Sequence, residues 1–462
     1  MAVKNDFSRG SVAGNILRLA VPLMLAQLVN VLYNVVDRIF IGHIGGSALP
    51  LTGVGLCMPV ITVISAFSGL FGMGGAPICG VARGRGDIQE AEQVQNTSFV
   101  LLVGCGLLLT VLGEVFLTPI LTLFGASADT MPYAAGYLRI YLLGTVFVMI
   151  SLGMNYFINT QGFAGTGMLT VAIGAVLNLI LDPVFIFGFD MGVAGAAVAT
   201  VLSQLASCLY VLRFLFSKTV PVAVTFGGYD GRLMLRILAV GMTPFLIIGV
   251  DNIMIISMNA ILQSYGGAEL GDRLVTCATI AQSFMLVVTM PLGGISAGTG
   301  TILAYNYGAR RRDRILKAQA FIAGLCAAYV TLLFLLARLG GALFVRLFTT
   351  EPALAAEALD AIHICTLALI PLGLQYAIVD GFTGMGKVQL ALPLSAFRKA
   401  VYFIALFALP AAFGARATFY AEPISDILGP IVSIIVYALA IRRILSFPPD
   451  PPAAEAKAPL PS

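Results

Sequence analysis

The chain has 462 residues, of which 59% are hydrophobic and only 10% are charged, and its mean hydropathy is +0.97. Since roughly a quarter of the residues in a soluble domain are charged, this composition excludes water as the main solvent of the fold. The net charge of +4 does not indicate a nucleic-acid partner, because the basic residues gather in alternate loops between apolar segments.

Apolar runs that are long enough to cross a membrane follow one another almost without a break from Ile16 to Leu445. A spanning helix needs about 20 mostly apolar residues. The polar breaks predict twelve such helices, at approximately 16–42, 50–81, 96–118, 134–159, 163–187, 193–216, 234–262, 274–306, 318–337, 357–384, 388–413 and 417–445. The predicted fold class is therefore an all-α membrane protein.

The distribution of Lys and Arg predicts the orientation of these helices. With an even number of helices, twenty of the 26 basic residues fall on the side of the two termini and six on the other side. The twenty include the run Arg310, Arg311, Arg312 and Arg314, interpreted as a topology anchor that meets lipid head groups, and Arg398 and Lys399 at the start of the eleventh helix. The positive-inside rule then predicts a multi-pass protein of the bacterial plasma (inner) membrane with both termini cytoplasmic.

The two halves of the sequence resemble each other. The matching pairs are GFAGTG at 162–167 with GFTGMG at 381–386, LFGASADTMPYAAGYL at 123–138 with LFTTEPALAAEALDAI at 347–362, and RGRGD ending at Asp87 with ARRRD ending at Asp313, at offsets of 219, 224 and 226. Each repeat holds six helices, an even number, so both halves enter the membrane in the same orientation. We therefore predict two parallel six-helix bundles around a central cavity, which is the usual plan for alternating access.

The predicted domains follow from this repeat. They are an N-terminal bundle at 1–216, a cytoplasmic linker at 217–233, a C-terminal bundle at 234–446 and a disordered cytoplasmic tail at 447–462.

Four polar residues predict a cation site in the first bundle. An ionisable group inside a span costs roughly 2.5 to 3.5 kcal/mol on insertion scales, so a retained one needs a reason. Asn178 and Asp182 lie one turn apart on the fifth helix. Thr200, about seven residues into the next helix, and Asp37, about five residues before the end of its own, lie near the same depth. Two carboxylates, an amide and a hydroxyl form an all-oxygen site suited to Na⁺ or to a shared proton.

Occupancy of such a site can drive a conformational change, because two close carboxylates cannot cheaply stay ionised without a cation or a proton. The alternative is structural: Asp37 pairs with Arg38 near the interface, and Asp182 caps its helix before Pro183. Adding 222 to Asp37 gives Asn259, so the carboxylate is not repeated there. Adding 219 to Asn178 and Asp182 gives Phe397 and Val401, which predicts no second copy of the site.

Polar residues at helical spacing predict the wall of a substrate cavity. The first and fourth predicted helices each carry a polar row, and the seventh and tenth carry isolated polar pairs. The candidates are Gln27, Asn30, Asn34, Asn155, Asn159, Asp251, Asn252, Gln375 and Tyr376. Hydrogen bonding between helices is the alternative explanation. Asp380, close to the GFTGMG turn, is interpreted as an interfacial cap.

The seven cysteines all fall in apolar spans without a CxxC pair or a His at metal spacing, so we expect buried hydrophobic side chains and no cofactor. A membrane-embedded enzyme would need a nucleophile with a base, or a metal cluster, in one cavity. The sequence contains no such set.

Several distant segments resemble the MATE (multidrug and toxic compound extrusion) family, in the right order over nearly the whole chain. They are LAVPLMLAQLVNVLYNVVDRIFIGHIG, GAVLNLILDPVFIFGFDMGVAGAAVAT, GTILAYNYGARRRD, SAFRKAVYFIALFALP and AEPISD. The resemblance implies an antiporter that exports organic, often cationic, drug-like compounds in exchange for Na⁺ or H⁺. It maps the family's amino-terminal cation site onto Asp37, Asn178, Asp182 and Thr200. Small organic substrates and membrane lipid are the expected partners, with a monomer as the simplest assembly.

Two other transporters share parts of this pattern. A flippase of lipid-linked oligosaccharides or cell-wall precursors would be expected to have a cavity rich in Arg and Lys for pyrophosphate. The ionisable residues that we place at mid-span are acidic, which argues against it. A transporter of the major facilitator class is disfavoured because the loop after the second helix reads GVARGRGD.

Overall fold

The computed structural model describes residues 5–42, 44, 49–124, 126–217, 220–349 and 351–447. Within these ranges the side chains of residues 34, 35, 38, 39, 42, 268, 269 and 272 are not described. The predicted disordered tail at 447–462, apart from Phe447, and the predicted pairing with Arg38 therefore lie outside the described residues. Throughout the described ranges the regular structure is helical.

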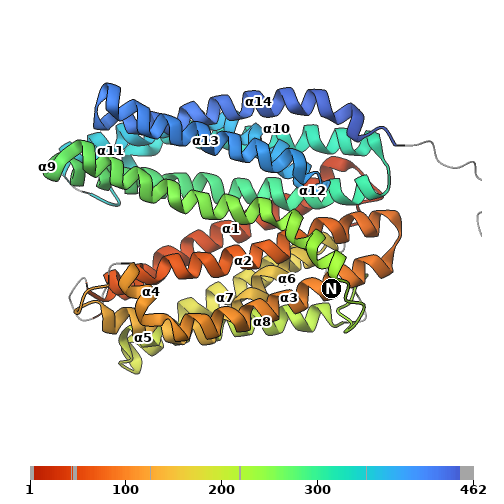
Figure 1. Cartoon of the computed structure of the whole chain (residues 1–462), viewed down its shortest axis with the longest axis horizontal. Coiled ribbons are helices and arrows are strands. Elements are labelled where there is room, and N and C mark those ends of the chain that lie inside the picture. The colour runs from red at the N-terminus through yellow and green to blue at the C-terminus, as the bar shows by residue number, and fades with distance from the viewer. Residues whose placement is uncertain are drawn as a thin grey trace, which may run out of the picture.

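The first half of the chain forms one group of helices, the lower one in Figure 1. Its elements are α1 (Val12–Gly42), α2 (Leu49–Arg85), α3 (Ile88–Val115), α4 (Leu117–Leu123), α5 (Met131–Leu143), α6 (Thr145–Thr160), α7 (Ala164–Pro183), the π-helix η1 (Val184–Gly188) and α8 (Gly192–Leu215).

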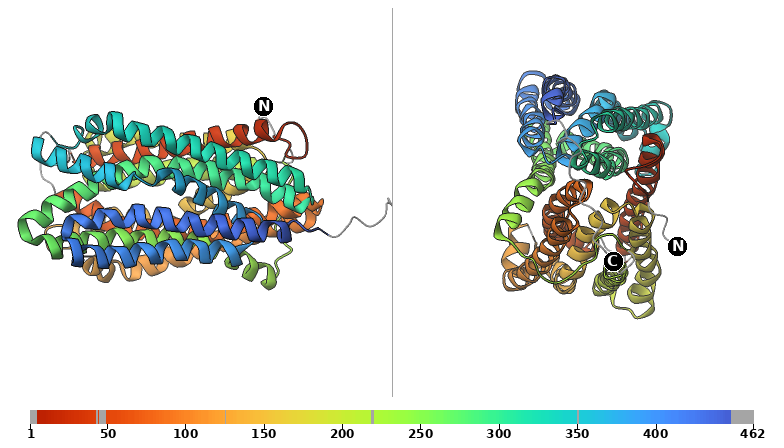
Figure 2. Two further views of the ribbon diagram at one scale, coloured as in Figure 1. Left: turned by 90° about the horizontal axis from the view of Figure 1, so that it is seen from above. Right: turned by 90° about the vertical axis from the view of Figure 1, so that its right-hand side faces the viewer.

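The second half forms the upper group in the same view. Its elements are α9 (Gly231–Gly308), α10 (Arg312–Val345), α11 (Pro352–Cys365), α12 (Leu369–Gly384), α13 (Val388–Phe413), the 3₁₀-helix η2 (Ala415–Tyr420) and α14 (Ala421–Ile444). The long element α9 contains two spans, because Gly267 has a non-helical backbone with φ of 69°. The two views in Figure 2 agree that the helices of both groups run along the long axis of the molecule.

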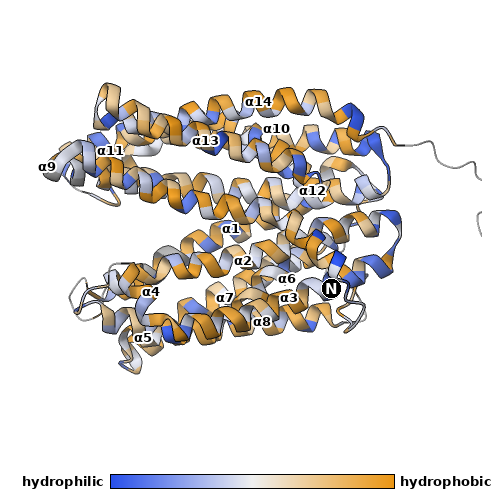
Figure 3. Cartoon of the chain, viewed as in Figure 1, coloured by the Kyte–Doolittle hydropathy of each residue, from blue (hydrophilic) through white to orange (hydrophobic). Residues whose placement is uncertain are grey.

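By length and composition, the described chain accounts for up to twelve spans, the number that the sequence predicts. Ten segments are long and apolar enough to cross a membrane, and two bent pairs, each counted as one span, bring the number to twelve. The bent pairs are α5 with α6, at 57°, and α11 with α12, at 47°. The sequence predicted these two spans as continuous helices, 134–159 and 357–384, so it missed the bends. Figure 3 shows hydrophobic residues along the length of the helices, with hydrophilic residues most frequent at the right-hand end of the view.

A near-symmetric contact joins the two halves where α2 packs against the last turns of α9. A Cβ atom at Gly84 would lie 1.9 Å from the carbonyl oxygen of Tyr305, and one at Gly308 would lie 2.0 Å from the carbonyl oxygen of Val81. Both pairs of equivalent residues, 84 with 308 and 81 with 305, are 224 positions apart. The contact therefore repeats itself across the interface, as expected for two parallel repeats.

The same shift of 224 corrects the sequence alignment of the repeats. Helices α3 and α10 begin at 88 and 312, and helices α7 and α13 begin at 164 and 388. The turn glycine with positive φ before α7 is Gly162, and its equivalent before α13 is Gly386, not Gly381. The offsets of 219 and 226 thus matched similar letters in the wrong register. In the corrected register Asn178 and Asp182 correspond to Tyr402 and Leu406, so the carboxylate is still not repeated.

The segment between the halves is held against the first bundle rather than hanging free. The side chain of Gln161 donates to the carbonyl of Val222 at 2.9 Å and accepts from its amide at 3.0 Å. The side chain of Asn96 accepts from the amide of Thr225 at 2.9 Å. These bonds fix the chain that leads into α9.

The N-terminal segment lies against the second half. Arg314 donates to the carbonyls of Gly10, at 3.1 Å, and Phe7, at 3.2 Å, and Arg311 donates to Ser8, at 2.6 Å. Two of the arginines predicted only to meet lipid head groups therefore hold this segment. The first part of α1 also contributes Ile16 and Leu19 to the hydrophobic core formed mainly by α9 to α14.

Candidate functional site

A cavity of about 460 Å³ lies between the two halves of the chain. Helices of both halves line it, including α1, α6, α7 and α8 on one side and α9, α12 and α13 on the other. Six of the predicted substrate residues belong to its wall: Gln27, Asn30, Asn155, Asn159, Gln375 and Tyr376.

The other three predicted substrate residues differ. The lining of the cavity, as the described residues define it, does not include Asp251 or Asn252. The Asn252 amide donates to the carbonyl of Ile248 at 2.8 Å, within its own helix, and Asp251 forms an ion pair with Lys399. The side chain of Asn34 is outside the described residues.

The four residues of the predicted cation site come together at one side of this cavity. Helices α7 and α8 are joined by the short η1 segment, so Thr200 returns to the depth of Asn178. The Asn178 amide donates to Asp182 Oδ1 at 3.2 Å and to Thr200 Oγ1 at 3.3 Å. The carboxyl groups of Asp182 and Asp37 are close enough to interact electrostatically. All four side chains are buried.

Two tyrosines that the sequence analysis missed complete this group. Tyr33 on α1 and Tyr137 on α5 both lie close to Asp37 and Thr200. Tyr141 stacks on Tyr137, with ring centroids 6.1 Å apart. The spacing of Tyr33 four residues before Asp37 puts both on one face of α1, which is the signal that could have identified it.

One buried carboxyl oxygen of this group has no hydrogen-bond donor within the described chain. Asp182 Oδ2 is buried and has no hydrogen-bond donor among the described residues. A neighbouring carboxylate cannot supply one, because an ionised carboxylate only accepts. The Asn178, Thr200 and Tyr33 side chains line the cavity, so the carboxyl groups lie just behind its wall.

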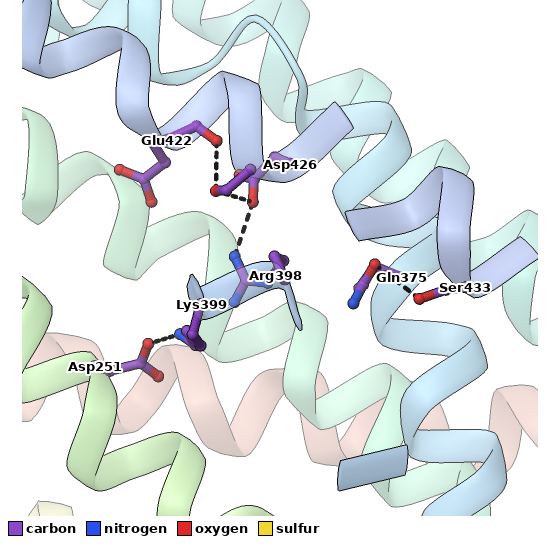
Figure 4. Close-up of polar contacts among 8 residues, drawn as sticks. Asp251, Gln375, Arg398, Lys399, Glu422, Asp426 and Ser433 are labelled. Atoms are coloured by element: carbon purple, nitrogen blue, oxygen red, sulfur yellow. Dashed lines mark hydrogen bonds and ion pairs between the residues drawn. The ribbon is translucent and has the colours of Figure 1, made fainter. Parts of the chain in front are cut away.

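The second half carries a group of charged residues that the sequence analysis misplaced. Arg398 and Lys399 lie ten and eleven residues into α13, about 15 Å along the helix, instead of at its cytoplasmic start. Their side chains are only 12% and 7% exposed, and both line the cavity. Figure 4 shows Lys399 directed at Asp251 on α9 and Arg398 directed at Asp426 on α14.

The partner of Arg398 explains how the helix tolerates this charge. Arg398 Nη1 lies 2.8 Å from Asp426 Oδ1, and this carboxylate is fully buried. Asp426 and Glu422 lie one turn apart on α14, within the AEPISD segment, but the sequence analysis did not select either. Two carboxylates four residues apart in a span were the signal that could have identified them.

Asp380 also differs from its prediction as an interfacial cap. It lines the cavity and accepts a hydrogen bond from Ser296 on α9. The argument that the mid-span ionisable residues are all acidic is therefore wrong, because two basic residues share the cavity wall with this carboxylate.

Comparison with known proteins decides the family. A family model described as MatE matches residues 22–184 and 248–406, which is more than half of the chain. The chain belongs to the MatE family. This MatE protein is therefore a transporter and not an enzyme.

Relatives of this MatE protein cover nearly its whole length. It is 25% identical over 442 residues to the multidrug export protein MepA of Staphylococcus haemolyticus (strain JCSC1435), covering 94% of this chain and 96% of the relative. It is 24% identical over 439 residues to the protein of the same name from Staphylococcus aureus (strain N315), with the same coverage of 94% and 96%.

Solved structures show the same fold. A crystal structure of MATE in complex with MaL6 has a TM-score of 0.90 at 23% identity, covering 97% of this chain and 100% of that one. The outward-facing conformation of a multidrug resistance MATE family transporter has a TM-score of 0.89 at 23% identity, with coverage of 96% and 99%. A transporter of the MOP superfamily from Pyrococcus furiosus has a TM-score of 0.89 at 23% identity, with coverage of 97% and 100%. The predicted fold of two six-helix repeats is thus confirmed, and the flippase alternative is not favoured.

Proposed function

We propose that this chain is a secondary active exporter of organic, drug-like compounds, often cationic, in exchange for Na⁺ or H⁺. The names of its relatives support the export of drugs, since those relatives are multidrug export proteins and cover 94% of the chain. The coupling rests on one observation: the carboxyl groups of Asp37 and Asp182 are both buried and interact electrostatically beside the cavity.

The site would couple the entry of the ion to the export of the substrate through a change in its charge. Without a cation or proton, two adjacent carboxylates repel each other, so α1 and α7 are pushed apart. A bound Na⁺ would find carboxylate, amide and hydroxyl oxygens, and a bound proton would bridge the two carboxyl groups. Because Asn178, Thr200 and Tyr33 also line the cavity, a change at the carboxyl groups alters the surface that a substrate meets. The ion and the substrate can then favour different conformations of the same bundle.

The membrane environment forms part of the proposal. We place the protein in the bacterial plasma membrane with both termini cytoplasmic, because most of its basic residues then face the cytoplasm. The sequence places twenty of the 26 basic residues on that side, and eighteen remain when Arg398 and Lys399, which lie within a span, are left out. It would contact lipid through its apolar helix surfaces and act on small molecules as a monomer.

Transport in vesicles tests the coupling site. Purified protein in liposomes would be given a fluorescent organic cation under an imposed Na⁺ or H⁺ gradient. The Asp37→Asn and Asp182→Asn variants are expected to lose gradient-driven transport. The control is Asp190→Asn, which changes an exposed acid two residues before α8. Coupled transport at the wild-type rate in both site variants would refute the assignment.

A cellular measurement separates export from lipid flipping. Cells that carry the protein are expected to accumulate less ethidium than cells without it. Unchanged ethidium together with altered envelope lipids would favour a flippase instead.

A further inference from the structure

The wall of the cavity formed by α12 and α13 presents hydrogen-bond donors. Arg398 and Lys399 on α13 and Gln375 on α12 all line it. The wall formed by α1, α6, α7 and α8 is different, because its polar groups are uncharged amides and hydroxyls such as Gln27, Asn155 and Ser203. The cavity is therefore polar and neutral on one side, whereas the other side carries charged groups, namely the donors Arg398 and Lys399 and the carboxylate of Asp380.

The Arg398 guanidinium has N–H donors that are not used by its ion pair. Its Nη1 is bound to Asp426, and within the described part of the chain it makes no further hydrogen bond. A guanidinium carries five N–H donors in a planar fork. The remaining donors are available to a group in the cavity, since Arg398 lines it.

Gln375 adds a donor that has no acceptor. Its Oε1 accepts a hydrogen bond from Ser433 at 3.1 Å, which orients the amide. Its Nε2 is buried and unpartnered among the described residues, although only 3% of the side chain is exposed. A buried unpaired donor costs roughly 1 to 3 kcal/mol, so it needs an explanation.

Gly429 on α14 brings this donor next to the arginine. A Cβ atom at Gly429 would lie 2.8 Å from Cγ of Arg398 and 3.1 Å from Oε1 of Gln375. Both side chains therefore pack against the same glycine, and their donor groups belong to one site. Figure 4 shows the Gln375 nitrogen pointing away from Ser433.

The acidic residues nearby do not cancel these donors. Asp426 and Asp251 each pair with one basic residue, and neither lines the cavity. The Asp251 side chain is 46% exposed, so it does not enclose the Lys399 ammonium, which also lines the cavity and can turn to a ligand there. Glu422 does not line the cavity either. Asp380 does line it, but it accepts a hydrogen bond from Ser296 and, within the described residues, forms no ion pair with Arg398 or Lys399.

We propose that Arg398, Lys399 and Gln375 form a subsite for a carboxylate group of the exported compound. A carboxylate accepts up to four hydrogen bonds and fits the planar arginine fork. The inference rests on the proposed export function and refines its substrate class: compounds that combine an aromatic, often cationic, body with a carboxylate. The neutral amide wall and the apolar lining would hold the body of such a molecule.

A matched pair of dyes tests the subsite. Binding of a rhodamine with a free benzoic acid and binding of its methyl ester would be measured by fluorescence polarisation on the purified protein. The wild type is expected to prefer the free acid by about tenfold, the effect of one charge-assisted hydrogen bond. Lys399→Met, and Arg398→Met combined with Asp426→Asn, are expected to remove that preference. The double variant avoids an unpaired buried carboxylate.

The control is Lys387→Met, which removes a basic residue that lies over the ring of Tyr307, outside the cavity. It should keep the preference for the free acid. Equal binding of the two dyes by the wild type, absence of binding of either, or a preference that survives in both cavity variants would overturn the inference. Binding with the expected preference but without ion-driven transport would refute the proposed function and leave the subsite standing.

Discussion

A single methyl group at Gly84 is expected to shift this transporter towards a state that is open at its predicted cytoplasmic end. A Cβ atom there would lie 1.9 Å from the carbonyl oxygen of Tyr305 and 2.9 Å from the amide nitrogen of Ala309. Real Cβ contacts are not shorter than about 3.0 Å, and the nearest atoms belong to backbone. In the Gly84→Ala variant, α2 and the end of α9 must therefore separate by about 1 Å.

The size of the effect follows from the cost of overpacking. Inserting a methyl group into a close-packed contact costs about 1 to 3 kcal/mol. If the contact exists only in the conformation described here, this cost shifts the conformational equilibrium by about fivefold to 150-fold. Gly308→Ala places its Cβ atom 2.0 Å from the carbonyl of Val81 and should act in the same way.

Cysteine labelling measures the shift. A cysteine replaces Ala304, which is fully buried in this interface, in a protein without the seven native cysteines. Labelling by an impermeant maleimide from the cytoplasmic side should rise in both alanine variants. Gly165→Ala is the control, because a Cβ atom at that position meets nothing within 4 Å. Folded variants whose labelling rate equals that of the control would refute the reasoning, and a melting curve identifies any variant that fails to fold.

Three further predictions follow from individual contacts. Tyr33→Phe removes a hydroxyl that lies close to Asp37 and Thr200 in the cavity wall, and it should weaken cation-driven transport by about twofold to tenfold at limiting ion concentration, the effect of one polar contact. Arg398→Leu leaves Asp426 buried and unpaired, so thermal unfolding should show a loss of about 3 to 5 kcal/mol, largely restored by a second change, Asp426→Asn. Gln161→Ala removes both hydrogen bonds to Val222, so limited proteolysis should cut the segment before α9 faster, as expected for a loss of about 1 to 3 kcal/mol.

Each of these three predictions has its own control measurement. Raising the ion concentration should restore transport in the tyrosine variant, and a loss that persists at saturation would contradict a role in binding. Equal stability of the single and double arginine variants would show that the ion pair is not what holds the buried carboxylate. Gln389→Ala, an exposed position at the start of α13, should leave proteolysis unchanged. Equal cutting of both glutamine variants would contradict the role of Gln161.

Much of this fold could be predicted from the sequence because its determinants are local. A run of apolar residues specifies a spanning helix wherever it occurs, since every backbone group is satisfied within the helix. The even number of helices per repeat then specified parallel bundles. Asn178 and Asp182 could be paired because four residues make one helical turn, and Thr200 could be added because a short connection joins α7 to α8.

The register between the two repeats depends on contacts between distant parts of the chain. The alignment of similar sequence segments therefore predicted the wrong offset. The letters GFAGTG and GFTGMG align at an offset of 219, but Gly381 lies inside α12. Only the backbone shows that Gly162 and Gly386 share the positive φ that ends a helix. The close approaches of Gly84 and Gly308 confirm the shift of 224, because they are contacts between the halves.

The charged wall of the cavity was likewise decided only by the tertiary structure. On sequence, Arg398 and Lys399 counted as markers of a cytoplasmic loop, because a basic residue inside a span is costly. That cost is offset by Asp426 from α14 and Asp251 from α9, which lie 28 and 148 residues away along the chain. Hydropathy shows which helices cross the membrane, whereas the partner that makes a buried charge tolerable comes from another helix and is visible only once the helices are packed.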